Sequence, residues 1–366
     1  MSRYFRYEGG GFNESNEIPN GYIKPTGDCL VISIMEHSSY PKIDLICDLV
    51  KRINIHKVVI DFVSCESYID VSIVRTLEQE LGEFELKILT VNILNNQFKS
   101  HIFFPNHAFQ LRDSFSRGDI MIEANKFIQW DVLKSKKRLK KYLFLNHHMR
   151  TERFKIFESL HLNNNLEHGL VSFNWTLDNE RFIPTNYDVT ANDIRYIKNS
   201  PAYGLLPLTL DGDVGAGYVF DNNITHIANP VYFQPQNTNI THFHNTYFEI
   251  ITEGFSSTTP VHPFADRTNI LHYSEKIYKP LFFMNPFSYW GPENTLEQFS
   301  KWFGFSFECP LYHCNNNGYE LDAFNRKVNE FASLSYSDLH SIYYDSFAEF
   351  EHNRNILINY LKNIQI

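Results

Sequence analysis

The strongest fold signal in this chain lies in two segments, YFEIITEG at residues 247–254 and HYSEKIYKPLFFMNPF at residues 272–287. The first segment is an apolar run that closes in polar residues, and it predicts a buried strand. The second predicts a helix, because Ser274 is a favourable N-cap and the charged pair Glu275 and Lys276 follows it. Strand ends and helix starts meet where open α/β sheets bind ligands. The two segments therefore predict both an α/β fold and the place of a site.

A regular alternation of strands and helices fills the first part of the chain. The predicted strands are the apolar runs CLVISIM at 29–35, KVVIDFV at 57–63 and LKILTVNI at 86–93. Between them, residues 41–53 and 69–81 carry apolar side chains at helical spacing. Apolar runs separated by amphipathic helices predict parallel strands that are buried on both faces, as in a Rossmann-like domain. The segment 101–118 has no such pattern, and we expect it to be irregular.

A second alternation starts near residue 140. It consists of a strand at 142–145, a helix at 150–162 and a strand at 169–175. The region from there to about residue 245 is rich in proline and glycine, and we interpret it as loops and short strands. The expected domains are 1–140 on the acceptor side and 141–345 on the donor side, followed by an amphipathic helix within 346–366 that crosses back to the first domain.

Composition narrows the class of protein. With 366 residues, of which 43% are hydrophobic, the chain is long enough for two cores. Its five cysteines are scattered without a CxxC pair, which favours a reducing compartment. Neither a signal peptide nor an apolar run of membrane-spanning length is evident, so we expect a cytoplasmic protein with no membrane span. The net charge of −9 argues against broad electrostatic binding to DNA or to anionic membranes.

One short segment is nevertheless strongly basic. Its cations are Lys134, Lys136, Lys137, Arg138, Lys140 and Lys141. One interpretation is a solvated helix end, since on a helix these side chains do not share one face. The other is a patch on the acceptor side that contacts phosphates if the acceptor is nucleic acid.

Several segments resemble the donor-binding half of GT-B glycosyltransferases of phage and bacterial type, and more distantly α-1,3-fucosyltransferases. TEG at 252–254 with SEKIYKP at 274–280 is similar to the pattern "VTET…TEKIfKPI" of that family. Further similar segments are LFLNHHMRTERFKIFESL at 143–160, GLVSFNW at 169–175 and GPENTLEQFSKWFGFSFE at 291–308. The resemblance implies two Rossmann-like domains that face a cleft. It also implies transfer of a sugar from a nucleotide-diphosphate sugar to a glycan or to a modified DNA base, and a phage origin.

The resemblance further implies a donor site. Its residues are Arg150, Arg153, Glu253, Ser274, Glu275, Lys276 and Lys279. Arg150, Arg153 and Lys276 would neutralise the departing diphosphate, and the glutamates would accept hydrogen bonds from ribose or sugar hydroxyls. The only DxD sequence, Asp211-Gly212-Asp213, lies in a glycine-rich segment typical of a turn. We therefore expect no metal and no cofactor apart from the sugar donor.

An inverting enzyme also needs a general base for the acceptor hydroxyl. Glu36 and His37, directly after the first predicted strand, are at strand-end positions that suit this role, and Glu66 follows the next strand. We expect Glu36 and His37 to be the catalytic pair, while a retaining mechanism stays open.

Two alternatives come from other classes of protein. His242, His244 and Glu249 match the HxH…E spacing of a cupin metal site, in which two histidines project from one strand. Alternatively, the chain is a GT-B-like binding or structural module without catalysis. This interpretation suits two departures from the family pattern, at His147 and Gly254.

Overall fold

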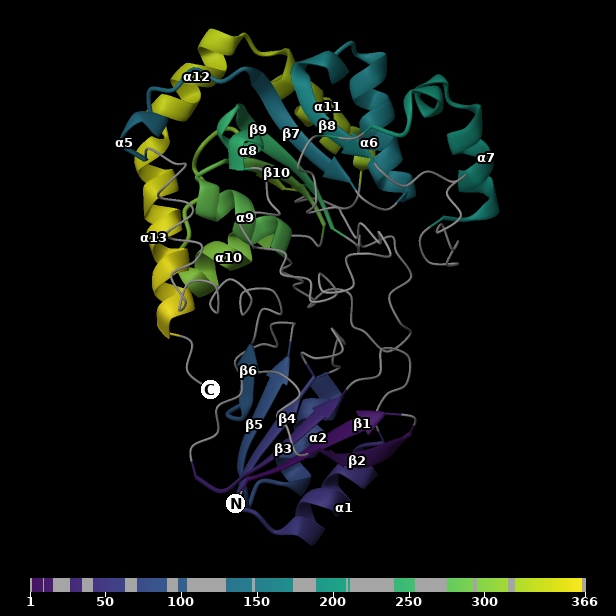
Figure 1. The fold of residues 1–366 in the computed structure, drawn as a ribbon, viewed down its shortest axis with the longest axis vertical. Coiled ribbons are helices and arrows are strands. Elements are labelled where there is room, and N and C mark those ends of the chain that lie inside the picture. The colour runs from purple at the N-terminus through teal and green to yellow at the C-terminus, as the bar shows by residue number, and fades with distance from the viewer. Residues whose placement is uncertain are drawn as a thin grey trace, which may run out of the picture. The chain divides into compact units, whose positions relative to one another are not determined.

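The chain folds into two compact α/β units, each built on a mostly parallel, Rossmann-like sheet (Figure 1). The predicted α/β class is thereby confirmed. The computed structural model describes residues 2–8, 10–15, 27–34, 42–62, 71–90, 98–103, 130–146, 149–173, 189–208, 210, 240–253, 275–291, 295–314 and 320–363.

The sheet of the first unit has the strand order β2-β1-β3-β4-β5-β6. Its strands are β1 (Arg3–Glu8), β2 (Gly11–Ser15), β3 (Cys29–Ile34), β4 (Lys57–Asp61), β5 (Glu85–Thr90) and β6 (His101–Phe103). All neighbours are parallel except the β1–β2 hairpin. The strands and helices predicted between residues 29 and 93 are confirmed. The expectation of an irregular segment after residue 101 is wrong for β6, whose three residues are too few to show a periodic pattern.

Helices α1 (Ile43–Ile53) and α2 (Val71–Glu80) connect β3 to β4 and β4 to β5. The chain moves from β3 to β4 to β5 in one direction across the sheet. Because such parallel connections are right-handed, both helices lie on the same face of the sheet, where they pack together. α1 buries its apolar side because Ile46, Leu49 and Val50 recur at helical spacing. It ends at Asn54, which has a left-handed backbone (φ 54) and donates its N–H to the Val50 carbonyl.

The sheet of the second unit is entirely parallel and has the order β11-β10-β9-β7-β8. Its strands are β7 (Lys140–Asn146), β8 (Gly169–Phe173), β9 (Thr246–Thr252), β10 (Phe287–Trp290) and β11 (His313–Cys314). β9 is buried along its whole length, as its continuous apolar sequence predicts.

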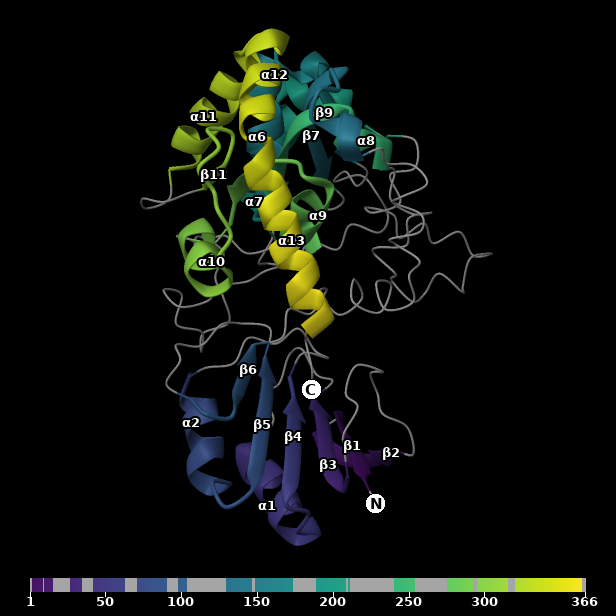
Figure 2. The same ribbon diagram turned by 90° about the vertical axis from the view of Figure 1, so that its left-hand side faces the viewer.

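Helices cover both faces of this second sheet. They are α5 (Trp130–Leu133), α6 (Thr151–Leu162), α7 (Ala191–Asn199), α8 (Ile240–His244), α9 (Glu275–Phe283), α10 (Thr295–Phe303), α11 (Leu321–Ser333), α12 (Tyr336–Asp345) and α13 (Phe347–Asn363). The helix predicted in the C-terminal tail is confirmed as α13, which runs beside α9 (Figures 1 and 2). The interpretation of residues 176–245 as loops and short strands is wrong for α7, which Thr190 starts with a capping box.

The two helical layers are visible in the alternating contacts of β9. The ring of Phe248 lies 5.9 Å from Phe331 of α11, while the ring of the preceding Tyr247 lies 6.4 Å from Tyr343 of α12. Successive strand residues point to opposite faces, so these contacts place α11 and α12 on opposite sides of the sheet. Within the part of the chain that the structure describes, no helix combines the length and the apolar character needed to cross a bilayer.

Candidate functional site

The order of the strands in the second unit defines one position for a site. From β7 the chain passes through α6 to β8 on one side, whereas from β9 it passes through α9 to β10 on the other. The connections therefore diverge between β7 and β9. In open α/β sheets, ligands bind outside the carboxyl ends of the strands at such a point.

A buried arginine joins three elements at this point. Arg153, in the first turn of α6, donates from Nε to Thr252 Oγ1 at 3.1 Å and from Nη2 to the Thr252 carbonyl at 3.4 Å. The Thr252 hydroxyl in turn donates to Asn146 Oδ1 at 3.3 Å. Because Asn146 ends β7 and Thr252 ends β9, the guanidinium lies at the carboxyl edge between the two strands.

An ion pair lies at the same edge. Lys276 Nζ is 3.3 Å from Glu253 Oε2. The Glu253 side chain is fully buried, while 33% of the Lys276 side chain is exposed. Glu253 directly follows β9 and Lys276 is in the first turn of α9. The accessible part of this pair is therefore the lysine side chain, on a helix start whose backbone N–H groups also favour anions.

A second glutamate is buried beneath this pair. Glu249 precedes Glu253 by four residues along extended backbone, so both side chains lie on the same face of the sheet. Burial raises the pKa of the Glu249 carboxyl to about 8, although the nearby Lys279 and Lys276 act in the opposite direction. Glu249 is therefore mostly protonated at neutral pH. Sequence reasoning assigned Glu249 only to the alternative metal site. The feature that could have identified it is an acidic residue inside an apolar strand.

Further polar atoms near the ends of β7 and β8 and at the start of α6 are buried and lack a hydrogen-bond partner among the described residues. They are Asn146 Nδ2, Thr151 Oγ1 and Ser172 Oγ. Buried polar groups are normally satisfied, so these atoms mark a place where a ligand or water completes the bonding. Sequence reasoning missed Asn146 and Thr252. The signal that could have found them is a polar residue closing an apolar strand.

The remaining predicted site residues are placed only in part. Arg150 is half-buried and has extended backbone at the N-cap position of α6, and Lys279 is buried in α9. Glu275 opens α9, as predicted, but its side chain is not among those described. Other predictions that lie outside the described residues are Glu36, His37, Glu66, His147, Asp211, Asp213, Gly254 and Ser274.

The first unit has its own buried carboxyl group at a strand end. Ser33 Oγ donates to Asp61 Oδ2 at 3.1 Å, and both residues are fully buried. The register pairs them across β3 and β4, close to the carboxyl ends of these strands. This is the edge at which the catalytic base was expected, and sequence reasoning did not single out Asp61.

The cupin alternative is wrong in its geometry. His242 and His244 lie in the short helix α8, whereas that alternative needs them on a strand. Burial lowers the pKa of His244 to about 3, with Arg138 and Lys136 acting in the same direction. Among the residues that the structure describes, no three His, Cys, Asp or Glu side chains are grouped closely enough to hold a metal ion.

The basic segment is largely committed to contacts within the second unit. Lys136, Lys140 and Lys141 donate to protein oxygens at 3.1, 2.6 and 2.7 Å. The Arg138 guanidinium lies 3.5 Å from the centre of the Tyr343 ring and is buried. The interpretation as a solvated helix end is wrong because α5 stops at residue 133, and these contacts also leave few charges for phosphates.

Comparison with known proteins adds nothing to this geometry, because no family model, curated protein or solved structure matches the chain. The fold and the site define an α/β protein whose second sheet carries paired charges at the point where its strand order reverses.

Proposed function

We propose that the second unit binds a nucleotide-diphosphate sugar and that the protein is a glycosyltransferase of the GT-B type. The observation that carries this proposal is that two cations, Arg153 and Lys276, are bound to consecutive residues at the carboxyl end of β9, through Thr252 and Glu253. Each comes from the first turn of a helix that follows one of these strands. Helix starts and cationic side chains both favour the phosphate groups of a nucleotide.

The chemistry of transfer suits these groups. The bond between the anomeric carbon and the diphosphate breaks, a bond from an acceptor oxygen to that carbon forms, and the acceptor's proton passes to a base. Negative charge develops on the departing diphosphate. Lys276 supplies a positive charge there, and Arg153 fixes the strand ends through Thr252. The proposal assigns the neutralising charge to Lys276 and to the start of α9, and it needs no metal ion.

Glu253 changes its partner in this scheme. When Lys276 turns to the diphosphate, the buried Glu253 carboxylate becomes available to accept hydrogen bonds from ribose or sugar hydroxyls. The base on the acceptor side stays assigned to Glu36 and His37. A glycan is the better acceptor than a modified DNA base, because most of the cations that would contact DNA phosphates are bonded within the second unit.

Nucleotide binding tests the proposal directly. We would measure thermal shifts and calorimetric affinities for UDP, GDP, CMP, dTDP and their common sugars, in EDTA and again with magnesium or manganese. A ligand at 100 times its dissociation constant stabilises the folded state by about 2.7 kcal/mol, which gives a readable shift. We expect one nucleotide to bind in EDTA, and Lys276→Gln to abolish that binding.

The matched control is Lys301→Gln, which removes an exposed lysine from α10 in the same unit. Its affinity should equal that of the unmodified protein. Lack of binding by every nucleotide in both conditions, or full affinity in Lys276→Gln, would refute the proposal. Nucleotide binding without transfer to any glycan or DNA acceptor would favour the non-catalytic module instead.

A further inference from the structure

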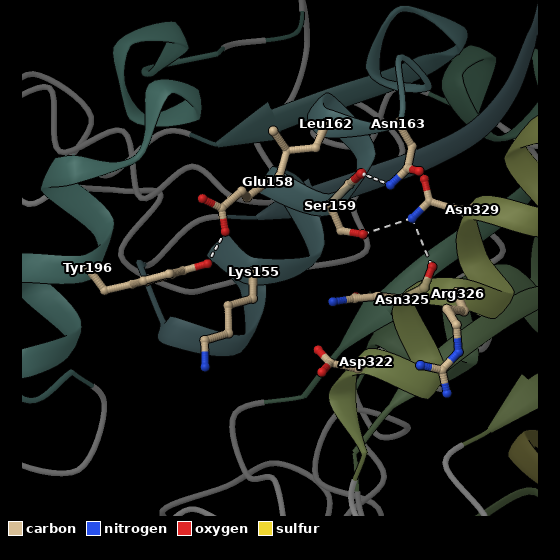
Figure 3. A pocket seen from close by; sticks show the side chains of 10 residues that line it. All are labelled: Lys155, Glu158, Ser159, Leu162, Asn163, Tyr196, Asp322, Asn325, Arg326 and Asn329. Atoms are coloured by element: carbon tan, nitrogen blue, oxygen red, sulfur yellow. Dashed lines mark hydrogen bonds between the residues drawn. The ribbon is translucent and has the colours of Figure 1, made fainter.

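A second recess lies away from the strand ends, between α6, α7 and α11 (Figure 3). Its volume is about 680 Å³, within the range of about 300 to 1,000 Å³ typical of small-molecule sites. The residues of α6 that line it are on the outward side of the helix, whereas Arg153 of the strand-end site points inward and does not line it. The recess is therefore separate from the site described above.

Hydrogen bonds within α6 and between the three helices fix its shape. Asn329 of α11 donates to Ser159 Oγ of α6 at 2.9 Å, and Asn163 donates to the Ser159 carbonyl at 2.7 Å. The Tyr196 hydroxyl of α7 donates to the Glu158 carboxylate of α6. The lining side chains are thus held in place before any ligand arrives, which lowers the entropic cost of binding.

One wall of the recess contains an amide with unused bonding capacity. Asn325 is only 8% exposed, and its Oδ1 has no hydrogen-bond partner among the described residues. In Figure 3 this side chain extends from α11 into the space between α11 and α6 with its amide nitrogen foremost, so Asn325 offers a hydrogen-bond donor to the recess.

The charges of the lining balance. Two positive side chains, Lys155 and Arg326, and two negative ones, Glu158 and Asp322, line the recess. It therefore offers hydrogen-bond donors and acceptors without a net charge. Sugar hydroxyls both donate and accept, and the flat faces of sugar rings lie well on aromatic rings such as that of Tyr196, which is 41% exposed. A phosphate or polyanion would find the two carboxylates unfavourable.

We propose that this recess binds a neutral oligosaccharide. The inference rests on the recess alone and does not depend on the function assigned to the strand ends. Its place on the outer surface of α6 suits an extended glycan, of which the recess holds a few sugar units.

Binding of neutral trisaccharides tests this assignment. We would titrate the full-length protein with trisaccharides of glucose, galactose, mannose and N-acetylglucosamine, using calorimetry and saturation-transfer NMR. At least one should bind with a dissociation constant on the order of 1 mM or tighter. The double variant Asp322→Ala, Arg326→Ala should weaken that binding by about tenfold or more, because both lost partners are charged hydrogen-bonding groups. These residues are exposed, so the variant should fold.

Two controls separate the possible results. Glu330→Ala removes an exposed acid of α11 that does not line the recess, and it should bind the trisaccharide normally. Lys276→Gln should also bind the trisaccharide normally even though its nucleotide binding is lost. Absence of binding by all four trisaccharides would overturn the proposal. Unchanged affinity in the double variant, or tight binding of inorganic pyrophosphate that the double variant abolishes, would overturn it as well.

Discussion

Replacing Glu249 by glutamine should make the stability of the second unit less dependent on pH. Glu249 is buried within β9, and its Oε2 has no hydrogen-bond partner among the described residues. Glutamine has nearly the same shape but does not titrate. The variant therefore removes the proton equilibrium of this position while it keeps the packing of the strand. Its buried amide adds a cost of about 1 to 3 kcal/mol that is the same at every pH.

The sign of the pH effect follows from the raised pKa. Burial shifts the pKa of Glu249 from an ordinary value of 4.5 to about 8 in the folded protein. Below pH 4.5 the carboxyl is protonated in both states, and its contribution to stability is fully present. As the pH rises, the unfolded chain releases the proton first, so stability falls until the pH passes about 8. At about 1.4 kcal/mol per pH unit, the whole interval corresponds to at most about 5 kcal/mol.

Urea unfolding between about pH 5 and about pH 9 measures this loss. Trp290 of β10 is buried in the second unit, so tryptophan fluorescence reports the unfolding of that unit. We expect the free energy of unfolding of the original protein to fall with pH relative to Glu249→Gln. The control Glu330→Gln, at an exposed position of α11, should follow the original protein. If the free energies of unfolding of the original protein and of Glu249→Gln differ by the same amount at every pH in this range, the reasoning is refuted.

Three further substitutions test the packing by urea unfolding. Gly169→Ala should cost about 1 to 3 kcal/mol, because a Cβ at this glycine would lie 2.3 Å from the Tyr142 ring; an unchanged midpoint would show that the ring moves freely. Asn353→Ala should cost about 1 to 3 kcal/mol, since this buried amide bonds both the N–H and the carbonyl of Ser306; a smaller loss would mean that water replaces it. Thr190→Ala should cost about 1 kcal/mol by removing the cap of α7, and a neutral result would contradict the capping box.

Much of the fold could be predicted because the apolar pattern and the burial agree. The continuous runs of β3, β4 and β9 are buried on both faces, and the periodic segments became α1, α2 and α6. The failures have physical causes. β6 spans three residues, too few for a period, and its pairing with β5 is set by the sheet. α7 is marked mainly by its cap, which the surrounding proline and glycine residues obscured.

The sequence allowed single residues of the site to be predicted, but not their arrangement in space. The sequence drew attention to Arg153, Glu253 and Lys276 separately, through a family resemblance. Their convergence depends on the strand order, which brings Thr252 beside Asn146 from 106 residues away. The state of Glu249 depends on the helices that bury it, and a single residue in an apolar run carries no sign of such packing. Long-range register and burial are therefore the parts of the site that local patterns do not contain.

The pair of Glu253 and Lys276 also limits what the strand-end site accepts. A ligand that draws Lys276 away removes a nearby positive charge from the buried Glu253 carboxylate, which is costly unless the ligand also supplies hydrogen-bond donors. Inorganic pyrophosphate supplies only the anion, whereas a nucleoside diphosphate brings hydroxyl donors as well. We therefore expect pyrophosphate to bind at least about tenfold more weakly than the preferred nucleoside diphosphate, and Glu253→Gln to narrow this gap. Calorimetry with both ligands measures this difference in affinity. Equal affinities would mean that Glu253 takes no part in recognition.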